Sequence, residues 1–411
     1  MPANVITLAQ RDSTTLPYGN GRSYGDSCLA ASGRVLHMRQ LNRFISVDWQ
    51  AGVLRAEAGV TLAQILQLAV PKGWFLSVTP GTKFVTLGGA IANDVHGKNH
   101  HLKGTFGNHL RAFCLSRSNE ELKQCTPFEN AELYRATIGG LGLTGIILWA
   151  EIQLSPIHSN EMDTFATRFS NLKDFFRLSD QLDSLNEYGV AWVDCVAKGE
   201  KLGRGVYFVG NHAPFGEFRE STRREWAMPF TPPVSLINNL SLRAFNEAYW
   251  RSHPREMSFS RSAYETFFFP LDRIANWNRM YGPKGFQQYQ CVVPEPNAEA
   301  AIEALLSVIS NSGLGSFLAV LKRCGSIASP GLLSFPLPGV SLALDFPNNS
   351  LTANLFKALD IIVFEAGGRL YPAKDAHMDG HHFRAAYPAW EELESLRDPL
   401  LNSEFWKRVT S

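Results

Sequence analysis

The stretch FVTLGGAIANDVHGKNHH, residues 84–101, restricts the fold of this chain more than any other segment. It combines three glycines, three histidines and one lysine, which lets the backbone approach another group closely. A metal site, an anion cradle and one wall of a cofactor pocket all match this composition. For zinc, His96 and His100 have the spacing of a helical ligand pair, but Gly97 lies between them and no third ligand of usual spacing follows. We therefore expect no metal, and a loop suited to a planar, anionic cofactor.

The histidines of this region are not equivalent. His100, His101 and His109 are expected to be ordinary loop residues. His96 and Lys98 instead place two cationic or hydrogen-bonding side chains directly beside the glycine backbone. These two are the candidates for contact with a bound group.

Composition excludes several classes of protein. The chain has 411 residues, which predicts two domains, and its net charge of +1 gives nucleic-acid binding no support. Six cysteines without a CxxC argue against a zinc ribbon or a disulfide framework and fit a reducing compartment. The start, MPANVITLAQRDS, lacks the pattern of a signal peptide, and no apolar run reaches the ~18 residues of a membrane span. We expect a cytoplasmic protein.

Periodicity and turn residues predict an α+β order, without the regular βαβ alternation of a parallel sheet. Strands are predicted at VLHM, FISVDW, VLRAEAG, GVAWVDCV, GRGVYFVG, YETFFFPL, GFQQYQCVV, SFLAVLKRC and GVSLALDFP. Helices are predicted in TLAQILQLAVPKGW (61–74), in 171–185, in 298–310 and in LTANLFKALDIIVFEAGG (351–368). Residues 219–250 are expected to be irregular. The texture of the sequence changes after Pro156, which marks a candidate domain boundary.

A second glycine motif, YGNGRSYGDS (18–27), is not a dinucleotide fingerprint. Its spacing is GxGxxxG and no helix is expected to open after it. Small consecutive residues can still turn their N–H groups toward an anion such as a pyrophosphate. A plain tight turn remains an equal alternative for this motif alone.

Four segments together carry a family resemblance: GNGRSYGDS (19–27), residues 78–109, ATIGGLGLTGII (136–147) and RLYPAKD (369–375). In this order they resemble the decaprenylphosphoryl-β-D-ribose 2′-oxidase-like branch of the vanillyl-alcohol-oxidase (PCMH-type) FAD flavoproteins. The resemblance implies a bipartite FAD-binding domain made of residues 1–155 and 366–411. A substrate-binding α+β cap, an antiparallel sheet flanked by helices, would occupy residues 156–365.

The resemblance also implies which residues contact FAD. They are Gly19, Asn20, Gly21, Arg22, Ser23, Tyr24, Thr82, Gly88, Gly89, Ala90, Asn93, His96, Gly140, Gly142, Thr144, Gly145 and Ile146. Many relatives attach FAD covalently through a histidine of the first loop. Tyr24 takes that place here, so the resemblance implies non-covalent FAD.

Two residues are candidates for catalysis by the same resemblance. Lys374 of YPAKD matches a lysine at the flavin and substrate, and His96 is the second candidate. Oxidation of a secondary alcohol moves a hydride to the flavin and a proton to a base, and a nearby cation stabilises the reduced ring. A lysine desolvated beside a flavin suits either role. Which residue accepts the proton stays open.

Substrate contacts are expected mainly in the middle of the chain. The candidates are Gln288, Gln290, Lys322, Tyr371 and Lys98. The two glutamines are two residues apart and share one face of a strand, which suits contact with sugar hydroxyls. A phosphate-bearing substrate would require a cation such as Lys322. Structural pairing of these polar side chains remains an equal alternative.

The chain departs from the family pattern at two places. Val340, Ser341, Leu342 and Ala343 stand where the mycobacterial-type enzyme has Trp-Asn-Ile-Cys, so the tryptophan and the cysteine of that pocket are absent and the exact substrate stays open. The family also has a further strand and part of a helix before LPYGNG. Either this chain starts late or that element is dispensable.

The resemblance implies oxidation of a sugar alcohol, with the 2′-hydroxyl of a polyprenylphosphoryl pentose as the expected site. The alternatives are an oxidase of small soluble alditols, sugars or aldonolactones, and a flavin-binding subunit without turnover. A short-chain reductase that completes an epimerisation is a plausible partner. Residues 226–246, beside Arg223 and Arg224, are apolar and proline-interrupted, so they suit a polyprenyl chain, the inner membrane face, or packing within the same domain.

Overall fold

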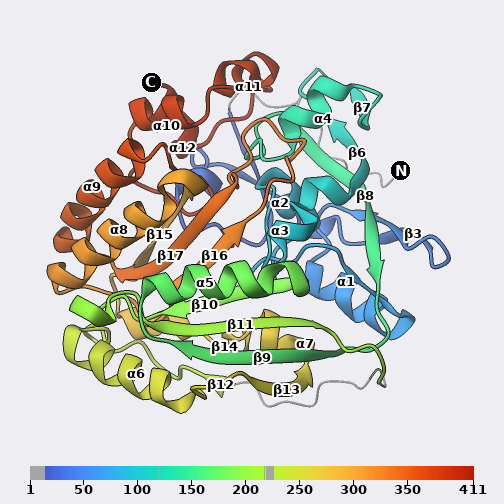
Figure 1. Ribbon diagram of the computed structural model, residues 1–411. Helices are drawn as coiled ribbons and strands as arrows, with labels where there is room; N and C mark the ends of the chain where they lie inside the picture. Colours follow the sequence, from blue (N-terminus) through green and yellow to red (C-terminus); the bar gives the residue numbers. More distant parts are fainter. Residues whose placement is uncertain (1–13, 120, 217, 219–225) are drawn as a thin grey trace.

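The computed structural model describes residues 14–119, 121–216, 218 and 226–411, and Figure 1 shows their arrangement. Expectations that concern residues 1–13, Arg223, Arg224 and the side chain of Trp226 lie outside the described part. Two large sheets dominate, here called the first sheet and the second sheet. The parallel pair β1 (Leu16–Tyr18) and β2 (Val35–His37) and the small pair β12 (Trp226–Ala227) and β14 (Ile274–Ala275) complete the strands.

The first sheet has the order β3-β4-β8-β6-β7, and β5 pairs with β8. Its strands are β3 (Phe44–Asp48), β4 (Val53–Glu57), β5 (Trp74–Leu76), β6 (Leu110–Ser116), β7 (Leu122–Cys125) and β8 (Ile146–Pro156). The helices α1 (Leu62–Ala69) and α4 (Ala131–Thr137) belong to this region. Helix α1 begins where predicted, because Thr61 and Gln64 cap each other's backbone N–H groups.

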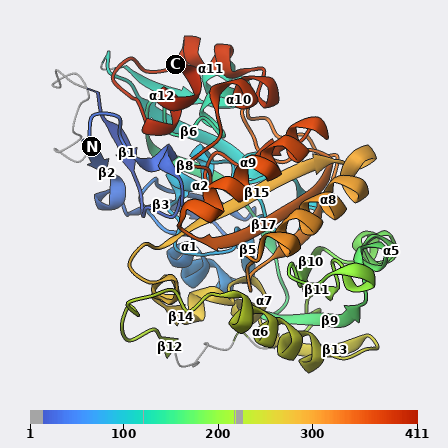
Figure 2. The same ribbon diagram turned by 90° about the vertical axis from the view of Figure 1, so that its left-hand side faces the viewer.

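The second sheet has eight strands in the order β13-β9-β11-β10-β16-β17-β15-β18 and is antiparallel throughout. Its strands are β9 (Glu161–Phe169), β10 (Tyr188–Val193), β11 (Gly205–His212), β13 (Ser258–Ala263), β15 (Phe286–Pro294), β16 (Val320–Cys324), β17 (Gly339–Pro347) and β18 (Arg369–Leu370). Helices α5 (Leu172–Leu182), α8 (Ala298–Ser312) and α9 (Ser350–Glu365) contact one another in that order and pack on these strands. Figure 2 shows α8 and α9 running along β15 and β17.

The last part of the chain returns to the beginning. After α10 (Gly380–Ala386) and α11 (Trp390–Leu396), helix α12 (Glu404–Thr410) packs on the short 3-10 turn η2 (Asp26–Cys28). The backbone of Thr15 donates to Leu400, and Glu404 donates to Leu29. Leu16, Met378 and Trp406 therefore belong to the same hydrophobic core as the helices of the second sheet. After β8 the chain leaves the first sheet and enters the second sheet, which β18 later joins. The domain boundaries at residues 156 and 365 stay a prediction.

Three local predictions were wrong. Residues 84–101 contain helices α2 (Leu87–Ala92) and α3 (His100–Lys103) rather than a continuous loop. Thr86 caps α2 by accepting from Gly89 N, and Gly88 lets the helix lie close to Ala58, whose Cβ would be 3.0 Å from an added Cβ. Two glycines concealed the helix, because they disfavour helix formation in isolation.

The other two wrong predictions also concern helices. The region expected to be irregular contains α6 (Asn239–Ser252), which Asn238 and Ser241 cap reciprocally. YETFFFPL forms α7 (Tyr264–Phe268) rather than a strand, and Tyr264 and Phe268 bury their rings on Phe75. Aromatic residues favour strands on average, but tertiary packing decided the outcome here.

Candidate active site

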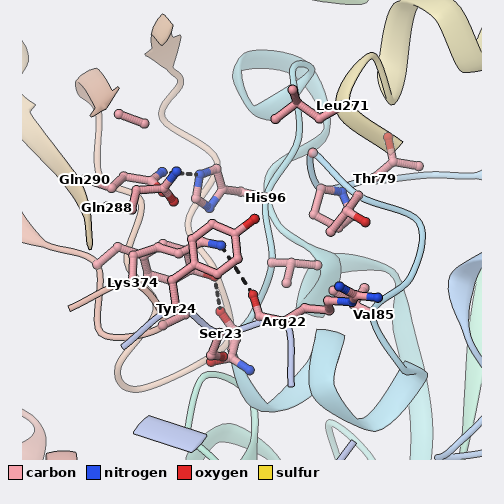
Figure 3. Close-up of a pocket in the computed structure, with 18 of the residues that line it drawn as sticks. Arg22, Ser23, Tyr24, Thr79, Val85, His96, Leu271, Gln288, Gln290 and Lys374 are labelled. Carbon is pink, nitrogen blue, oxygen red and sulfur yellow. Dashed lines mark hydrogen bonds between the residues drawn. The ribbon is translucent and has the colours of Figure 1, made fainter. Parts of the chain in front are cut away.

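One cavity of about 720 Å³ lies where the first glycine motif, helix α2, the second sheet and YPAKD meet. The cofactor candidates that line it are Gly19, Asn20, Gly21, Arg22, Ser23, Tyr24, Thr82, Gly88, Gly89, Asn93, His96, Gly142 and Gly145. The substrate candidates Gln288, Gln290, Lys322, Tyr371 and Lys98 line it as well, and so does Lys374. Figure 3 shows Gln288, Gln290 and His96 gathered near Lys374 and Tyr24. Segments from both ends of the sequence thus share one site.

Four of the named cofactor candidates do not line this cavity. Ala90 and Ile146 are buried in hydrophobic clusters, and Thr144 is a fully buried hydroxyl that pairs with Thr137 at 2.8 Å. Gly140 is required for a different reason: a Cβ there would overlap the Ala136 carbonyl oxygen. These residues support the walls of the site from behind, and their proposed contact with a cofactor has no support from the cavity.

The first glycine motif is joined to YPAKD by its backbone. Tyr24 N donates to Ala373 O at 3.0 Å, and Asp26 N donates to Asp375 O at 3.2 Å. Between these two bonds, an added Cβ on Gly25 would overlap the Asp375 carbonyl group. A glycine is required at this contact, and the contact brings Lys374 into the cavity.

Lys374 lies at the centre of the polar part of the cavity. Its Nζ is 3.7 Å from the centroid of the Tyr24 ring and donates to Arg22 O at 3.4 Å. Desolvation lowers the pKa of Lys374 to about 8, although the nearby Asp345 carboxylate raises it. An amine with this pKa exchanges its proton near neutral pH, which suits acid–base chemistry.

His96 faces the second sheet from the segment after α2. Its Nε2 lies 3.3 Å from Gln290 Nε2, while no described residue offers a hydrogen-bond partner to the buried Nδ1. Burial, and then the charge of Lys322, hold the pKa of His96 well below its usual range. The ring is therefore neutral, and its Nδ1 is available to a bound group.

Two further lysines lie close together beside this polar centre. Lys98 Nζ donates to Phe267 O and lies 4.5 Å from the centroid of that ring, and Lys322 Nζ donates to Gly97 O at 3.0 Å. Desolvation lowers the pKa of Lys98 to about 7, with a further contribution from Lys322, and lowers that of Lys322 to about 8. Within the described part of the chain, neither lysine forms an ion pair with a carboxylate. A bound anion would neutralise both.

Asp345 is a site residue that the sequence did not reveal. It lines the cavity from β17, is 2% exposed, and accepts a hydrogen bond of 2.6 Å from Gln288 Nε2. Desolvation raises the pKa of Asp345 to about 7, against the effect of Gln288. The available signal was a single acidic residue in the apolar strand GVSLALDFP, because a buried carboxylate in such a strand requires a partner.

The cavity also has an apolar and aromatic lining. It consists of Trp192, Phe208, Phe245, Tyr249, Phe317, Ile274 and Leu271. Phe245 on α6 also has 46% of its surface exposed, so part of this lining reaches the outside of the molecule. The cavity thus combines charged and hydrogen-bonding groups with apolar, aromatic side chains.

Comparison with known proteins identifies the family. A family model described as an FAD binding domain matches residues 3–126. Over 390 residues the chain is 36% identical to decaprenylphosphoryl-beta-D-ribose oxidase of Mycolicibacterium smegmatis. The aligned region covers 92% of this chain and 84% of that protein. The chain belongs to the decaprenylphosphoryl-β-D-ribose oxidase family. The resemblance inferred from the four sequence segments is confirmed.

Two other relatives of this chain extend the comparison. An uncharacterized protein of Streptomyces coelicolor is 32% identical over 356 residues, 82% of this chain and 95% of its own length. L-gulonolactone oxidase of Bos taurus is 31% identical over 183 residues, 44% of this chain and 39% of its own. The protein is an FAD-dependent oxidoreductase.

The cavity fits FAD on its own features. Gly21 has φ +59°, and an added Cβ would overlap the Tyr18 hydroxyl, so only glycine keeps this turn open toward the cavity. The unpartnered Nδ1 of His96 and the ammonium of Lys374 are the polar groups that a flavin ring would satisfy. Among the described residues no group of three or more His, Cys, Asp or Glu side chains is arranged so that it could hold a metal ion.

Proposed function

We propose that this oxidoreductase oxidises a secondary alcohol of a pentose that is linked through phosphate to a polyprenyl chain. The observation that carries the proposal is the combination of groups that line one cavity. Lys374, His96, Lys98 and Lys322 line it, and so do the aromatic side chains of Trp192, Phe208, Phe245, Tyr249 and Phe317. The polar groups would serve the reacting alcohol and the phosphate, and the aromatic side chains would serve the apolar chain. The 2′-hydroxyl of the pentose is the proposed reacting group.

The lysine pair supports a phosphate in the substrate. Desolvation lowers the pKa of both Lys98 and Lys322, and the charge of Lys322 lowers that of Lys98 further, while neither has a carboxylate partner in the described structure. A phosphate between Lys98 and Lys322 would reverse this unfavourable interaction and form charge-assisted hydrogen bonds. A neutral polyol would leave both lysines uncompensated. The pair therefore favours a phosphate-bearing substrate over a free alditol, sugar or aldonolactone.

The glutamines support recognition of a sugar. Gln288 and Gln290 are two residues apart on β15, so both side chains lie on the same face of the strand and line the cavity, as their spacing predicted. Gln290 is directed at His96 and Gln288 at Asp345, so each glutamine connects a prospective hydroxyl contact to a titratable group. Tyr371 has a structural role in addition, because its hydroxyl donates to Asn93 O at 3.0 Å and its ring stacks on Phe335.

The residues assign the following roles during oxidation. FAD, when bound, supplies the acceptor for the hydride that leaves the alcohol carbon. Lys374 in its neutral form takes the proton of the hydroxyl group, which leaves a ketone, and the resulting ammonium stays in the site as a positive charge. His96 orients the reacting groups through its Nδ1. Residues from the second sheet would act as the substrate-binding cap, with the FAD-binding part on either side of it in sequence.

Anaerobic mixing tests the proposal. The FAD-loaded protein is mixed in a stopped-flow instrument with a synthetic prenylphosphoryl pentose, with the same pentose phosphate lacking the prenyl chain, and with free alditols. Loss of the oxidised-flavin absorbance is expected with the prenylated substrate, more slowly with the unprenylated phosphate, and at a far lower rate with alditols. Bleaching by alditols alone would identify an oxidase of small soluble sugars instead. No bleaching by any sugar, with the same result for Lys374→Ala, would identify a flavin-binding subunit without turnover.

The membrane proposal rests on an exposed apolar segment. Leu240 is 81% exposed and Phe230 and Leu236 are exposed as well, while Leu242 of the same segment is buried. The segment thus packs partly on its own domain and presents the other side chains outward, and its Phe245 lines the cavity. We expect Leu236→Ser/Leu240→Ser to weaken sedimentation with phospholipid vesicles; unchanged sedimentation would contradict peripheral binding at the membrane. Within the described residues no helix is long and apolar enough to cross a bilayer.

Two smaller parts of the proposal have direct tests. FAD is proposed to be non-covalent, so acid precipitation should release it entirely into the supernatant, and a yellow pellet would contradict this. The ketone product is proposed to pass to a short-chain reductase, which would complete an epimerisation. Co-purification of the two proteins would test this partnership, and a cytoplasmic location is proposed with it.

A further inference from the structure

His377 is enclosed by carboxylates directly behind the lysine of the site. Its Nδ1 lies 3.0 Å from Asp375 Oδ1, and its Nε2 lies 3.2 Å from Asp360 of helix α9. The imidazole is 21% exposed, whereas Asp375 is 2% exposed. The ring also stacks on Tyr289 and packs on Phe356.

The geometry determines the protonation state of this ring. A neutral imidazole has one N–H, so one of its nitrogens would direct a lone pair at a carboxylate oxygen. An imidazolium donates from both nitrogens and satisfies both carboxylates at once. Burial lowers the pKa of His377, but the hydrogen bonds and charges of Asp360 and Asp375 raise it by more, so that the pKa is about 9.

The other charged and titratable groups that the structure describes beside these carboxylates fit this assignment. Tyr289 on β15 donates its hydroxyl to Asp360 at 3.0 Å, and the buried thiol of Cys291 on the same strand interacts with that carboxylate. From α12, Arg408 pairs with Asp375 at 2.9 Å and with Asp26 at 2.8 Å. The cluster therefore contains three carboxylates, of which Arg408 pairs with Asp375 and Asp26, and a charged His377 supplies the second positive charge.

This cluster holds the turn that carries Lys374. The Asp375 carboxylate accepts from the backbone N–H groups of His377 and Met378, which closes the turn immediately after Lys374. On the other side, Lys374 N and Asp375 N both donate to Tyr371 O. Displacement of Asp375 would therefore move Lys374 relative to the Tyr24 ring.

We propose that His377, as an imidazolium clamped between Asp360 and Asp375, is a positioning residue for Lys374 and that its deprotonation releases the Lys374 turn at alkaline pH. The proposal rests on the proposed role of Lys374 at the flavin. It assigns no contact between His377 and either substrate or FAD. His377 acts only through Asp375.

The direction of the pH effect follows from linkage. The folded-state pKa of about 9 exceeds the unfolded value of 6.5, so the stabilisation is complete below about pH 6.5 and is lost as the pH rises through 9. The two values correspond to at most about a 300-fold change in the folding equilibrium constant. The desolvated lysines of the site act in the opposite direction, because the unfolded chain binds their protons more tightly. Only a difference between two variants isolates His377.

The experiment compares the full-length wild type with His377→Gln and His377→Arg. His382→Gln is the matched control, because His382 of α10 pairs with Asp379, the exposed N-cap residue of that helix, at 3.3 Å. Urea unfolding of the FAD-free proteins is followed from pH 6 to pH 10. We expect wild type and His377→Gln to differ most at pH 6 and to converge above pH 9, whereas His377→Arg and His382→Gln stay close to wild type at pH 6.

FAD affinity then tests positioning rather than stability. At pH 7, for variants that the unfolding curves show to be folded, His377→Gln should bind FAD roughly tenfold more weakly, the equivalent of one lost charged contact, and His377→Arg should restore the affinity. Equal FAD affinity of the Gln variant and wild type would overturn the positioning role. If the difference in unfolding free energy between wild type and His377→Gln does not change with pH, the assignment of His377 as an imidazolium is wrong.

If a variant fails to fold, a measurement on the wild-type protein still tests the proposal. The imidazole resonance of His377 in wild type should titrate well above pH 6.5, and titration at or below that value overturns the proposal. None of these readouts uses a sugar. If no sugar reduces the flavin while they all behave as expected, the proposed substrate is wrong and the role of His377 stands.

Discussion

Gly25→Ala tests the joint between the two ends of the chain. The substitution needs no unusual backbone, because Gly25 has φ −97°, where alanine is ordinarily comfortable. Its cost is steric alone: the new Cβ would overlap the Asp375 carbonyl, which is backbone and has no side chain to rotate away. The first glycine motif and the Lys374 turn must then separate.

The expected destabilisation follows from what that separation breaks. Forcing an extra carbon into a packed contact costs about 1–3 kcal/mol. The bonds from Tyr24 N to Ala373 O and from Asp26 N to Asp375 O are at stake too, at about 0.5–1.5 kcal/mol each. We expect the free energy of unfolding to fall by about 2 to 6 kcal/mol. FAD affinity should fall with it, since Lys374 moves away from Tyr24.

Urea unfolding of the FAD-free protein and fluorescence titration with FAD measure the two effects. Gly81→Ala is the control for stability, because no atom lies within 4 Å of its added Cβ and the change should be neutral or slightly stabilising. If Gly25→Ala unfolds at the same urea concentration as wild type and binds FAD equally well, the two motifs are not in the tight contact described.

Three further predictions concern the cavity. Lys374→Met should lower the rate of flavin reduction by the prenylphosphoryl pentose at least about 100-fold in stopped-flow traces, and a smaller loss would exclude it as the base. In wild type the same rate should rise with pH through about 8, as Lys374 loses its proton, and decline through about 9 as His377 does; a flat profile would contradict both assignments. Lys322→Met should raise KM for the phosphate-bearing substrate about tenfold while KM for a free alditol is unchanged, and equal changes would place the phosphate elsewhere.

The sequence revealed the site where short motifs carry the signal. Gly21 and Gly88 belong to glycine-rich motifs that allow close backbone approach, and Lys374 was found through the family resemblance of YPAKD. The helix at Thr61 was found because its cap is local in sequence. These signals are contained within a few residues of the chain.

What stayed hidden depends on contacts between distant segments. Asp345 becomes a site residue only because β15 places Gln288 opposite it, and His377 only because α9 brings Asp360 to it. Helix α7 replaced a predicted strand because Phe75, far away in sequence, provides its packing surface. Hydrophobic periodicity describes one segment at a time and carries no information about such partners.

Strand β18 gives the end of the chain a second task. Residues 369 and 370 cover the outer edge of β15, and Lys374 follows only four residues later. A chain that is cut short before residue 366 would therefore lose its lysine and at the same time leave an open edge that can pair with other molecules. Incomplete copies would be removed by aggregation or proteolysis rather than accumulate as proteins that hold flavin without the residue that controls it.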